Sequence, residues 1–186
     1  RSLVGSEMCI RDRLEYAGAI EWVKGEESLA VWAGPSMNIF NREAEKEIEN
    51  LGFSGCFLSQ ELTIPQIRYI AKGSDIPLGA YVYGRTEMMI SEYCAINAVM
   101  GDKDKKHCPM YCMRGRFALK DGEGRRFPIH TDEWCHMHIA NCHVLDMRPY
   151  FDELKKAGLA ALTLDVRGNE GSIPVSYTHL TLPTIR

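Results

Sequence analysis

The sequence predicts an α/β protein: the later part of a TIM-like (β/α) barrel with a cysteine-rich insertion. Three observations support this class. Short apolar runs alternate with helix-like segments in the first half, the alternation stops at about residues 91–143, and one more helix and strand follow. Strands that alternate with helices at this spacing form βαβ units and a parallel sheet. Because a closed barrel takes about 250 residues, we expect an N-terminal part of the protein, with the first strands, to be missing from these 186 residues.

Strands are expected where short apolar runs lie between turn residues. The clearest run is Leu-Ala-Val-Trp-Ala at 29–33, whose continuous apolarity is typical of a strand buried on both faces of a parallel sheet. Three further strands are expected at 55–58, 77–82 and 159–166. Residues 14–27 give no clear pattern.

The helices between these strands have recognisable starts and ends. Asn41 is placed to cap the first helix, and Gly52 stands where that helix should stop. Thr-Ile-Pro-Gln at 63–66 has the form of a capping box and opens the second helix. Pro149 opens the last helix and Gly158 ends it. These signals place helices after the first two strands and before the last one.

The middle of the chain, at about 91–143, differs in composition. Between residues 103 and 126 there are eight lysines and arginines and three acidic residues, in a chain whose net charge is −3. Two apolar runs, at 116–119 and 126–129, flank a glycine-containing turn and predict a β-hairpin. The basic stretch is either a solvated face or a surface that contacts phosphates.

Four cysteines in this region are the candidate metal ligands: Cys94, Cys108, Cys112 and Cys135. They lie in polar, basic and glycine-rich sequence where core cysteines are not expected, whereas Cys56 lies within a predicted strand and should be buried. Four thiolates can hold a tetrahedral zinc ion or an iron–sulfur cluster. One tight Cys-x3-Cys pair with two remote cysteines differs from the paired knuckles of structural zinc sites. On spacing alone, a cluster, zinc and no metal all stay open, and disulfides would require an oxidising compartment.

Residues near these cysteines affect which side chains could bind the metal. Cys142 lies seven residues after Cys135, so on a helix both would share one face and Cys142 could replace it. Gly115 stands where the radical S-adenosylmethionine motif needs a third cysteine, so that motif is absent. His136 and His138 are either ordinary histidines or hydrogen-bond partners of a metal ligand.

Polar residues follow the predicted strands, where the catalytic loops of β/α barrels lie. The candidates for substrate binding are Asn38, Glu61 and Arg85. Glu61 has the chemistry of a general base, and Arg85 has that of an anion clamp. The alternative is that these side chains only cap helices and hold loops.

The two ends of the chain carry an inverted repeat at the level of DNA. Residues 7–12 can be written as GAG ATG TGT ATA AGA GAC, whose reverse complement encodes Val-Ser-Tyr-Thr-His-Leu, the sequence of residues 175–180. Such a repeat is typical of transposon-end sequencing adapters. We therefore expect residues 1–12 and 175–186 to be foreign to the protein, and residues 13–174 to be native.

Composition limits the class of protein further. The chain is 45% hydrophobic and 25% charged, as an ordinary soluble domain is. No apolar stretch approaches the roughly 18 residues of a membrane span, so we expect a cytoplasmic protein without a membrane partner. The net charge of −3 is too small to identify a partner by itself.

Several motifs, in order along the chain, resemble peptidase family U32, the collagenase-like peptidases. The segments that carry the resemblance are Gly34–Asn41, Leu58–Leu62, Tyr83–Cys94 and Arg116–Asp146. The resemblance implies a β/α barrel and a [4Fe-4S] cluster bound by the four cysteines named above. The family includes proteins named as proteases and others that hydroxylate tRNA, ribosomal RNA or a quinone precursor. It therefore implies either a peptidase or a protein that acts on tRNA or rRNA.

The chain departs from the best-known signature of that family at two positions. Gly79 stands where the signature has a glutamate, and Tyr83 stands where it has a histidine. This departure favours cluster-dependent RNA hydroxylation over peptide hydrolysis. The alternatives are a collagenase-like peptidase and a non-catalytic scaffold that holds a structural zinc ion.

Overall fold

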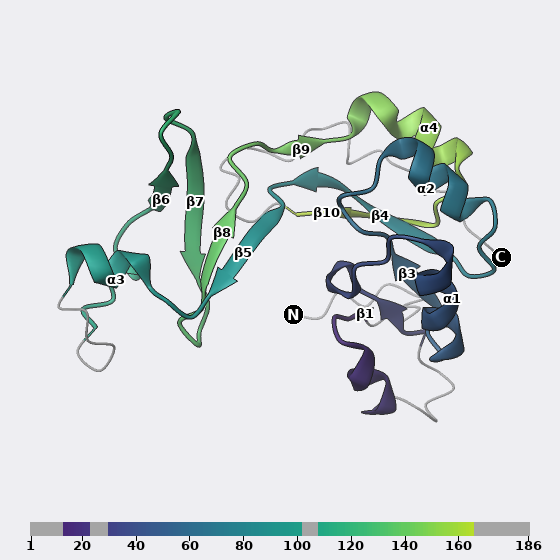
Figure 1. Cartoon of the computed structure of the whole chain (residues 1–186), viewed down its shortest axis with the longest axis horizontal. Coiled ribbons are helices and arrows are strands. Elements are labelled where there is room, and N and C mark those ends of the chain that lie inside the picture. The colour runs from purple at the N-terminus through teal and green to yellow at the C-terminus, as the bar shows by residue number, and fades with distance from the viewer. Residues whose placement is uncertain (1–12, 23–29, 102–107, 166–186) are drawn as a thin grey trace, which may run out of the picture. The chain divides into compact units, whose positions relative to one another are not determined.

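A computed structural model describes residues 13–22, 30–101 and 108–165 of the chain (Figure 1). These residues divide into two compact units. The first comprises the described residues up to Val82 together with 147–164, and the second comprises those between Tyr83 and Asp146 together with Asp165. The expected foreign ends, 1–12 and 175–186, lie outside the described residues.

The first unit is built on a curled, largely parallel sheet. Its strands, in order across the sheet, are β1 (Arg13–Leu14), β2 (Trp32–Ala33), β3 (Gly55–Phe57), β4 (Leu78–Gly84) and β10 (Ala161–Leu164). β1 to β4 pair in parallel, and β10 joins beside β4, where the Ala160 N–H donates to the carbonyl oxygen of Leu78. This arrangement confirms the predicted α/β class and is compatible with part of a β/α barrel.

The first two helices of the first unit begin where the sequence signals place them; in the last, Pro149 lies in a 3-10 turn and the α-helix begins at Phe151. α1 (Arg42–Asn50) is capped by Asn41, whose Oδ1 accepts a hydrogen bond from the Ala44 N–H at 2.8 Å. α2 (Ile64–Ala71) opens with the predicted capping box of Thr63 and Gln66. The remaining helical elements described here are α4 (Phe151–Lys156) and the 3-10 helices η1 (Ala17–Trp22), η2 (Pro35–Met37) and η5 (Arg148–Tyr150).

The core of the first unit combines side chains of the sheet, its loops and its helices. Its largest fully buried side chains are Ile39, Cys56, Leu58, Ile70, Val82, Leu154 and Leu159. The aromatic rings of Trp32 and Phe57 pack beside each other, with their centroids 5.4 Å apart. Glycines make room for them, because a Cβ added at Gly79 would meet the Phe57 ring at 2.4 Å and one at Gly55 would meet the Trp32 ring at 2.6 Å.

The second unit is built on a four-stranded antiparallel sheet. Its order is β5 (Glu87–Ser91), β8 (Met137–Ala140), β7 (Arg126–Thr131) and β6 (Phe117–Lys120). β6 and β7 form the predicted hairpin, with Phe117 opposite Ile129. α3 (Ala95–Met100) and the 3-10 helix η4 (Tyr111–Met113) contact each other, and β9 (Leu145–Asp146) pairs with the end of β4. None of the described helices has the length and apolarity that crossing a membrane requires.

This unit begins earlier in the sequence than the expected region at 91–143, since it starts at Tyr83. The difference is β5, a strand that was not expected from the sequence. Met88, Met89 and Ile90 are all exposed, and the register of β5 shifts between Glu87 and Met89. The strand therefore lacks the alternation of apolar and polar residues that reveals a half-buried strand.

Candidate functional site

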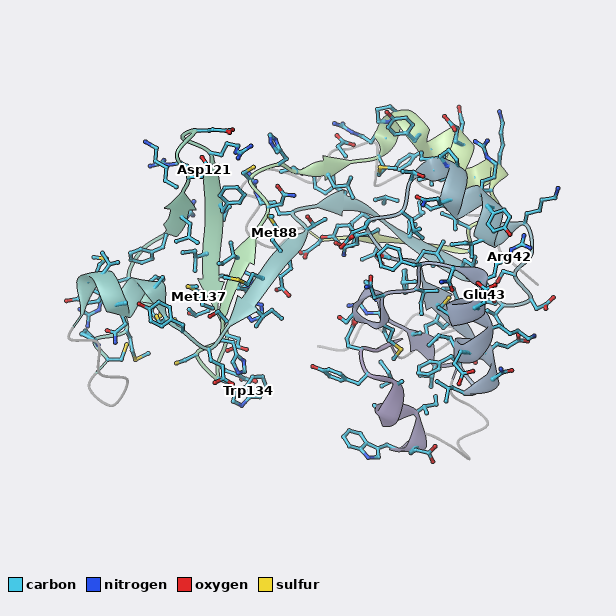
Figure 2. The ribbon with its side chains drawn as sticks, viewed as in Figure 1. Arg42, Glu43, Met88, Asp121, Trp134 and Met137 are labelled. Atoms are coloured by element: carbon cyan, nitrogen blue, oxygen red, sulfur yellow. The ribbon has the colours of Figure 1, made fainter. Side chains whose placement is uncertain are left out.

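The four candidate metal ligands are attached to one end of the four-stranded sheet. Cys94 follows β5, Cys108 and Cys112 precede β6, and Cys135 lies in the turn from β7 to β8. Neighbouring strands are antiparallel in the order β5-β8-β7-β6, so the end of β5, the start of β6 and the β7–β8 turn share one end of the sheet (Figure 1). Trp134 marks this end in Figure 2, and Asp121 marks the opposite end. The fold thus attaches three separate cysteine-bearing segments of the sequence to one end of the sheet.

The segments that carry these cysteines have unusual backbone conformations. Among the described non-glycine residues, φ is positive at Asn38 (56°), Met110 (54°) and Cys135 (64°). Met110 and Cys135 both belong to cysteine-bearing segments. Such a conformation is disfavoured for residues with a Cβ and is concentrated at functional sites. Cys94 has a different constraint, because it is the N-cap of α3 and its Sγ accepts from the Asn97 N–H at 3.4 Å.

The cysteine sulfur atoms do not lie at the spacing of a zinc site. Tetrahedral zinc with Zn–S bonds of about 2.3 Å holds its sulfur atoms about 3.8 Å apart. In the described part of the chain, one group of three or more His, Cys, Asp and Glu side chains has ligand atoms within 4.8 Å of one another, and it contains no cysteine. The contact between α3 and η4 does bring the segments of Cys94 and Cys112 together. The assignment of the four cysteines to one metal site stays a prediction.

Cys142 lies at the other end of the sheet from Cys135, because β8 runs between them. The expectation that the two cysteines would share a helical face is wrong, since 137–140 form a strand. The carbonyl oxygens of Asn141 and Cys142 accept hydrogen bonds from Arg85 Nη1 at 2.9 and 2.6 Å. Arg85, the predicted anion clamp, therefore holds the loop that follows β8, and anion binding by it stays a prediction.

The other two predicted substrate-binding residues, Asn38 and Glu61, are linked in the first unit through Ser59. Asn38 Oδ1 accepts a hydrogen bond from Ser59 Oγ at 2.8 Å, and this Oγ accepts from the Glu61 N–H at 3.4 Å. Ser59 is buried, whereas Glu61 is exposed. The structure therefore brings Asn38 and Glu61 together as parts of adjoining loops, and a role in substrate binding stays a prediction.

A cluster of histidines and carboxylates that the sequence did not reveal lies on the sheet of the second unit. His138 Nδ1 is 2.5 Å from Glu87 Oε2, and His138 Nε2 is 3.5 Å from Asp132 Oδ2. The His130 ring stacks on that of His138 with the centroids 4.7 Å apart. Partial burial raises the pKa of Asp132, but hydrogen bonds from the His136 side chain and backbone, together with the nearby His138 ring, outweigh this effect and lower that pKa to about 2.

Strand register assembles this cluster. His130 and His138 are equally distant in sequence from Trp134, in the β7–β8 turn, and the pairing of the two strands sets them directly opposite each other. The sequence signal was therefore a pair of histidines placed symmetrically about a turn. It was hidden because the turn itself was not predicted, and because Glu87 comes from the unrecognised strand β5.

A family model matches most of the chain. The model described as Peptidase family U32 matches residues 17–179, which include every described residue from Ala17 onward. The match runs past Pro174, into the segment expected to be foreign. No curated protein and no solved structure matches the chain.

Proposed function

The chain belongs to peptidase family U32, and from this premise we propose that it binds a [4Fe-4S] cluster and acts in the hydroxylation of tRNA or rRNA. The proposed ligands are Cys94, Cys108, Cys112 and Cys135. The observation that carries the proposal is the attachment of all four to one end of the antiparallel sheet. Four thiolates are the usual ligands of such a cluster, which supplies one-electron redox chemistry when bound.

The burial of the cysteines supports this choice of ligands. Cys94, Cys108 and Cys112 are half-buried and Cys135 is exposed, so a metal can reach their thiols without opening a core. Cys56 differs, because its side chain is fully buried and burial raises the pKa of its thiol to about 12. Since the thiolate is the form that ligates metal, Cys56 is unsuited to the role.

Exposed basic residues on the same unit support an RNA partner. Arg114, Lys120 and Arg126 are exposed near or within the β6–β7 hairpin. Arg125 instead forms an ion pair within the hairpin turn, where its Nε lies 2.6 Å from Asp121 Oδ2. Lysine and arginine side chains near phosphates give nucleic-acid affinity that falls steeply with salt. We therefore expect RNA binding that weakens as the salt concentration rises.

Two residues of β4, Gly79 and Tyr83, argue against the peptidase alternative. Gly79 replaces the glutamate of the family's best-known signature, and the Phe57 ring fills the space where a side chain at Gly79 would begin. A glutamate could enter only if that ring moved. Tyr83 replaces the histidine of the signature, so neither ionisable side chain of that motif is available for hydrolysis.

The test of the function is the nucleoside composition of RNA in the host. The full-length gene is deleted, and the modified nucleosides of tRNA and rRNA are compared by mass spectrometry. We expect a hydroxylated nucleoside to disappear and to return with the wild-type gene. The gene with Cys142→Ala should restore it as well, because Cys142 lies at the other end of the sheet. The gene with Cys112→Ala should not.

Two outcomes would contradict the proposal. Unchanged RNA nucleosides, together with cleavage of gelatin by the purified full-length protein, would favour the peptidase. Restoration by Cys112→Ala as complete as that by Cys142→Ala would show that the four-cysteine site is not needed for the reaction.

A further inference from the structure

One face of the second unit's sheet gathers ligand-type side chains from three neighbouring strands. β5, β8 and β7 lie side by side and contribute Glu87, His138 and His130 respectively. His130 and His138 are directly opposite across β7 and β8, so their side chains share a face. On β5 the register shifts between Glu87 and Met89. A bulge of this kind re-aims a side chain, and here the Glu87 carboxylate reaches the central His138.

The spacing within this group suits a single metal ion. The ligand atoms of Glu87, His130 and His138 all lie within 4.8 Å of one another. A tetrahedral ion with metal–nitrogen and metal–oxygen bonds of about 2.0–2.2 Å holds its ligand atoms about 3.3–3.5 Å apart. His138 Nδ1 and Glu87 Oε2, now 2.5 Å apart, would have to separate by only about 1 Å to receive it.

The other nitrogen of His138 explains how that separation can be favourable. His138 Nε2 is buried and has no hydrogen-bond partner among the described residues, although Asp132 Oδ2 is 3.5 Å away. A small movement of the His138 ring away from Glu87 and toward Asp132 would open space for the metal ion. The same movement would let His138 Nε2 donate a hydrogen bond to Asp132 Oδ2. Metal-ligating histidines commonly donate their second ring N–H to a carboxylate in this way.

Asp132 is fixed well enough to serve as that carboxylate. Its Oδ1 accepts hydrogen bonds from the backbone N–H groups of Trp134 at 3.0 Å and His136 at 2.8 Å. Its Oδ2 lies 2.8 Å from His136 Nδ1. The carboxylate is thus held by the β7–β8 turn and faces His138 without depending on it for its position.

We propose that Glu87, His130 and His138 bind a borderline divalent transition-metal ion such as zinc, with Asp132 holding the His138 ring. Two imidazoles and one carboxylate favour zinc, cobalt or nickel over magnesium and calcium, which prefer oxygen ligands throughout. Three protein ligands leave a fourth position for water. Glu87 and His130 are exposed, so the ion has access from solvent. The site uses none of the four cysteines and stands independently of the cluster.

The test is a titration of the full-length protein, as purified, with Co²⁺ followed by optical spectroscopy, and then with Zn²⁺ as competitor. We expect one additional equivalent of Co²⁺ to bind with the weak visible bands of nitrogen and oxygen ligands, and to be displaced by Zn²⁺. Both His130→Ala and Glu87→Gln should weaken this binding by at least about tenfold, and Asp132→Asn by about tenfold. His143→Ala is the matched control, because His143 is exposed and outside the group, and it should bind as the wild type does.

Equal affinity in His130→Ala, Glu87→Gln and His143→Ala would overturn the proposal, as would the intense bands of thiolate ligation in the bound Co²⁺. Far-UV circular dichroism identifies any variant that fails to fold. Glu87→Gln keeps the test decisive, since it changes only one exposed carboxylate. Iron content, measured on the same samples, should be unchanged in His130→Ala, so failure of this site and failure of the cluster are distinguishable.

Discussion

The two units of the chain place cysteine in opposite environments. In the parallel-sheet unit Cys56 is fully buried, and burial, with the charge of Glu45, raises the pKa of its thiol to about 12. In the antiparallel unit Cys135 is exposed and has a left-handed backbone conformation in a turn anchored by Asp132. The Cys56 thiol is packed in the core, whereas the Cys135 thiol is exposed to solvent. The backbone of Cys135 is strained by its left-handed conformation. The four candidate metal ligands therefore all lie in the second unit.

The two sheets make this division possible. A parallel sheet is packed on both faces, so its strands carry apolar side chains and glycines. An antiparallel sheet can pack one face and leave the other free. In β8, Met137 and Ile139 are buried while His138, between them, projects from the opposite face. The second sheet can therefore carry ligand-type side chains without loss of its apolar face.

The largest expected effect is a difference between the two units in how much a leucine-to-alanine substitution lowers the free energy of unfolding. Leu58→Ala should lower the free energy of unfolding by about 2–5 kcal/mol, because it leaves a cavity in the core; Leu58 is 1% exposed. Leu119→Ala, in β6, should cost less than about 1 kcal/mol, since Leu119 is 39% exposed. Denaturant unfolding of this chain measures both. Equal losses would show that the two units are packed alike.

A smaller effect is expected at the glycine beneath the Phe57 ring. Gly79→Ala should cost about 1–3 kcal/mol by overpacking, since the added Cβ would meet the ring at 2.4 Å. Gly122→Ala is the control in the second unit, because nothing lies within 4 Å of a Cβ there. The cost of Gly79→Ala should shrink in a Phe57→Leu background. A cost that Phe57→Leu leaves unchanged would point to another cause.

The third prediction concerns reactivity and requires no loss of stability. In metal-free protein under native conditions near pH 8, iodoacetamide should alkylate Cys135 and spare Cys56, as peptide mass spectrometry can show. Because the pKa of Cys56 is about 12 in the folded state and about 8.5 in an unfolded chain, the unfolded state loses its proton first. The contribution of Cys56 to stability is therefore present below about pH 8.5 and is lost as the pH rises toward 12. Labelling of Cys56 as fast as Cys135 would contradict the contrast between the units.

Local signals in the sequence were sufficient for much of the fold. The cap at Asn41, the capping box at 63–66 and the hairpin of β6 and β7 are each specified by residues close together in the chain. The apolar run at 29–33 gave the position of β2 for a similar reason. Each of these elements could be predicted because the residues that determine it lie within it or directly beside it in the sequence.

What could not be predicted depends on contacts between distant residues. β5 was missed because Met88, Met89 and Ile90 are exposed and a bulge interrupts its register. The group of Glu87, His130 and His138 was missed with it, since strand order and register create that group. For the four cysteines the sequence supplied the residues, whereas their attachment to one end of the sheet follows from topology.

Whether these four cysteines hold one iron–sulfur cluster can be measured by the iron and acid-labile sulfide content of the full-length protein purified without oxygen. We expect about four irons and four sulfides per chain in the wild type and in Cys142→Ala, and loss of most of both in Cys112→Ala. Cys142→Ala is the matched control, because it removes a half-buried cysteine from the opposite end of the same sheet. One zinc ion per chain without iron, or equal iron in the two variants, would contradict the claim.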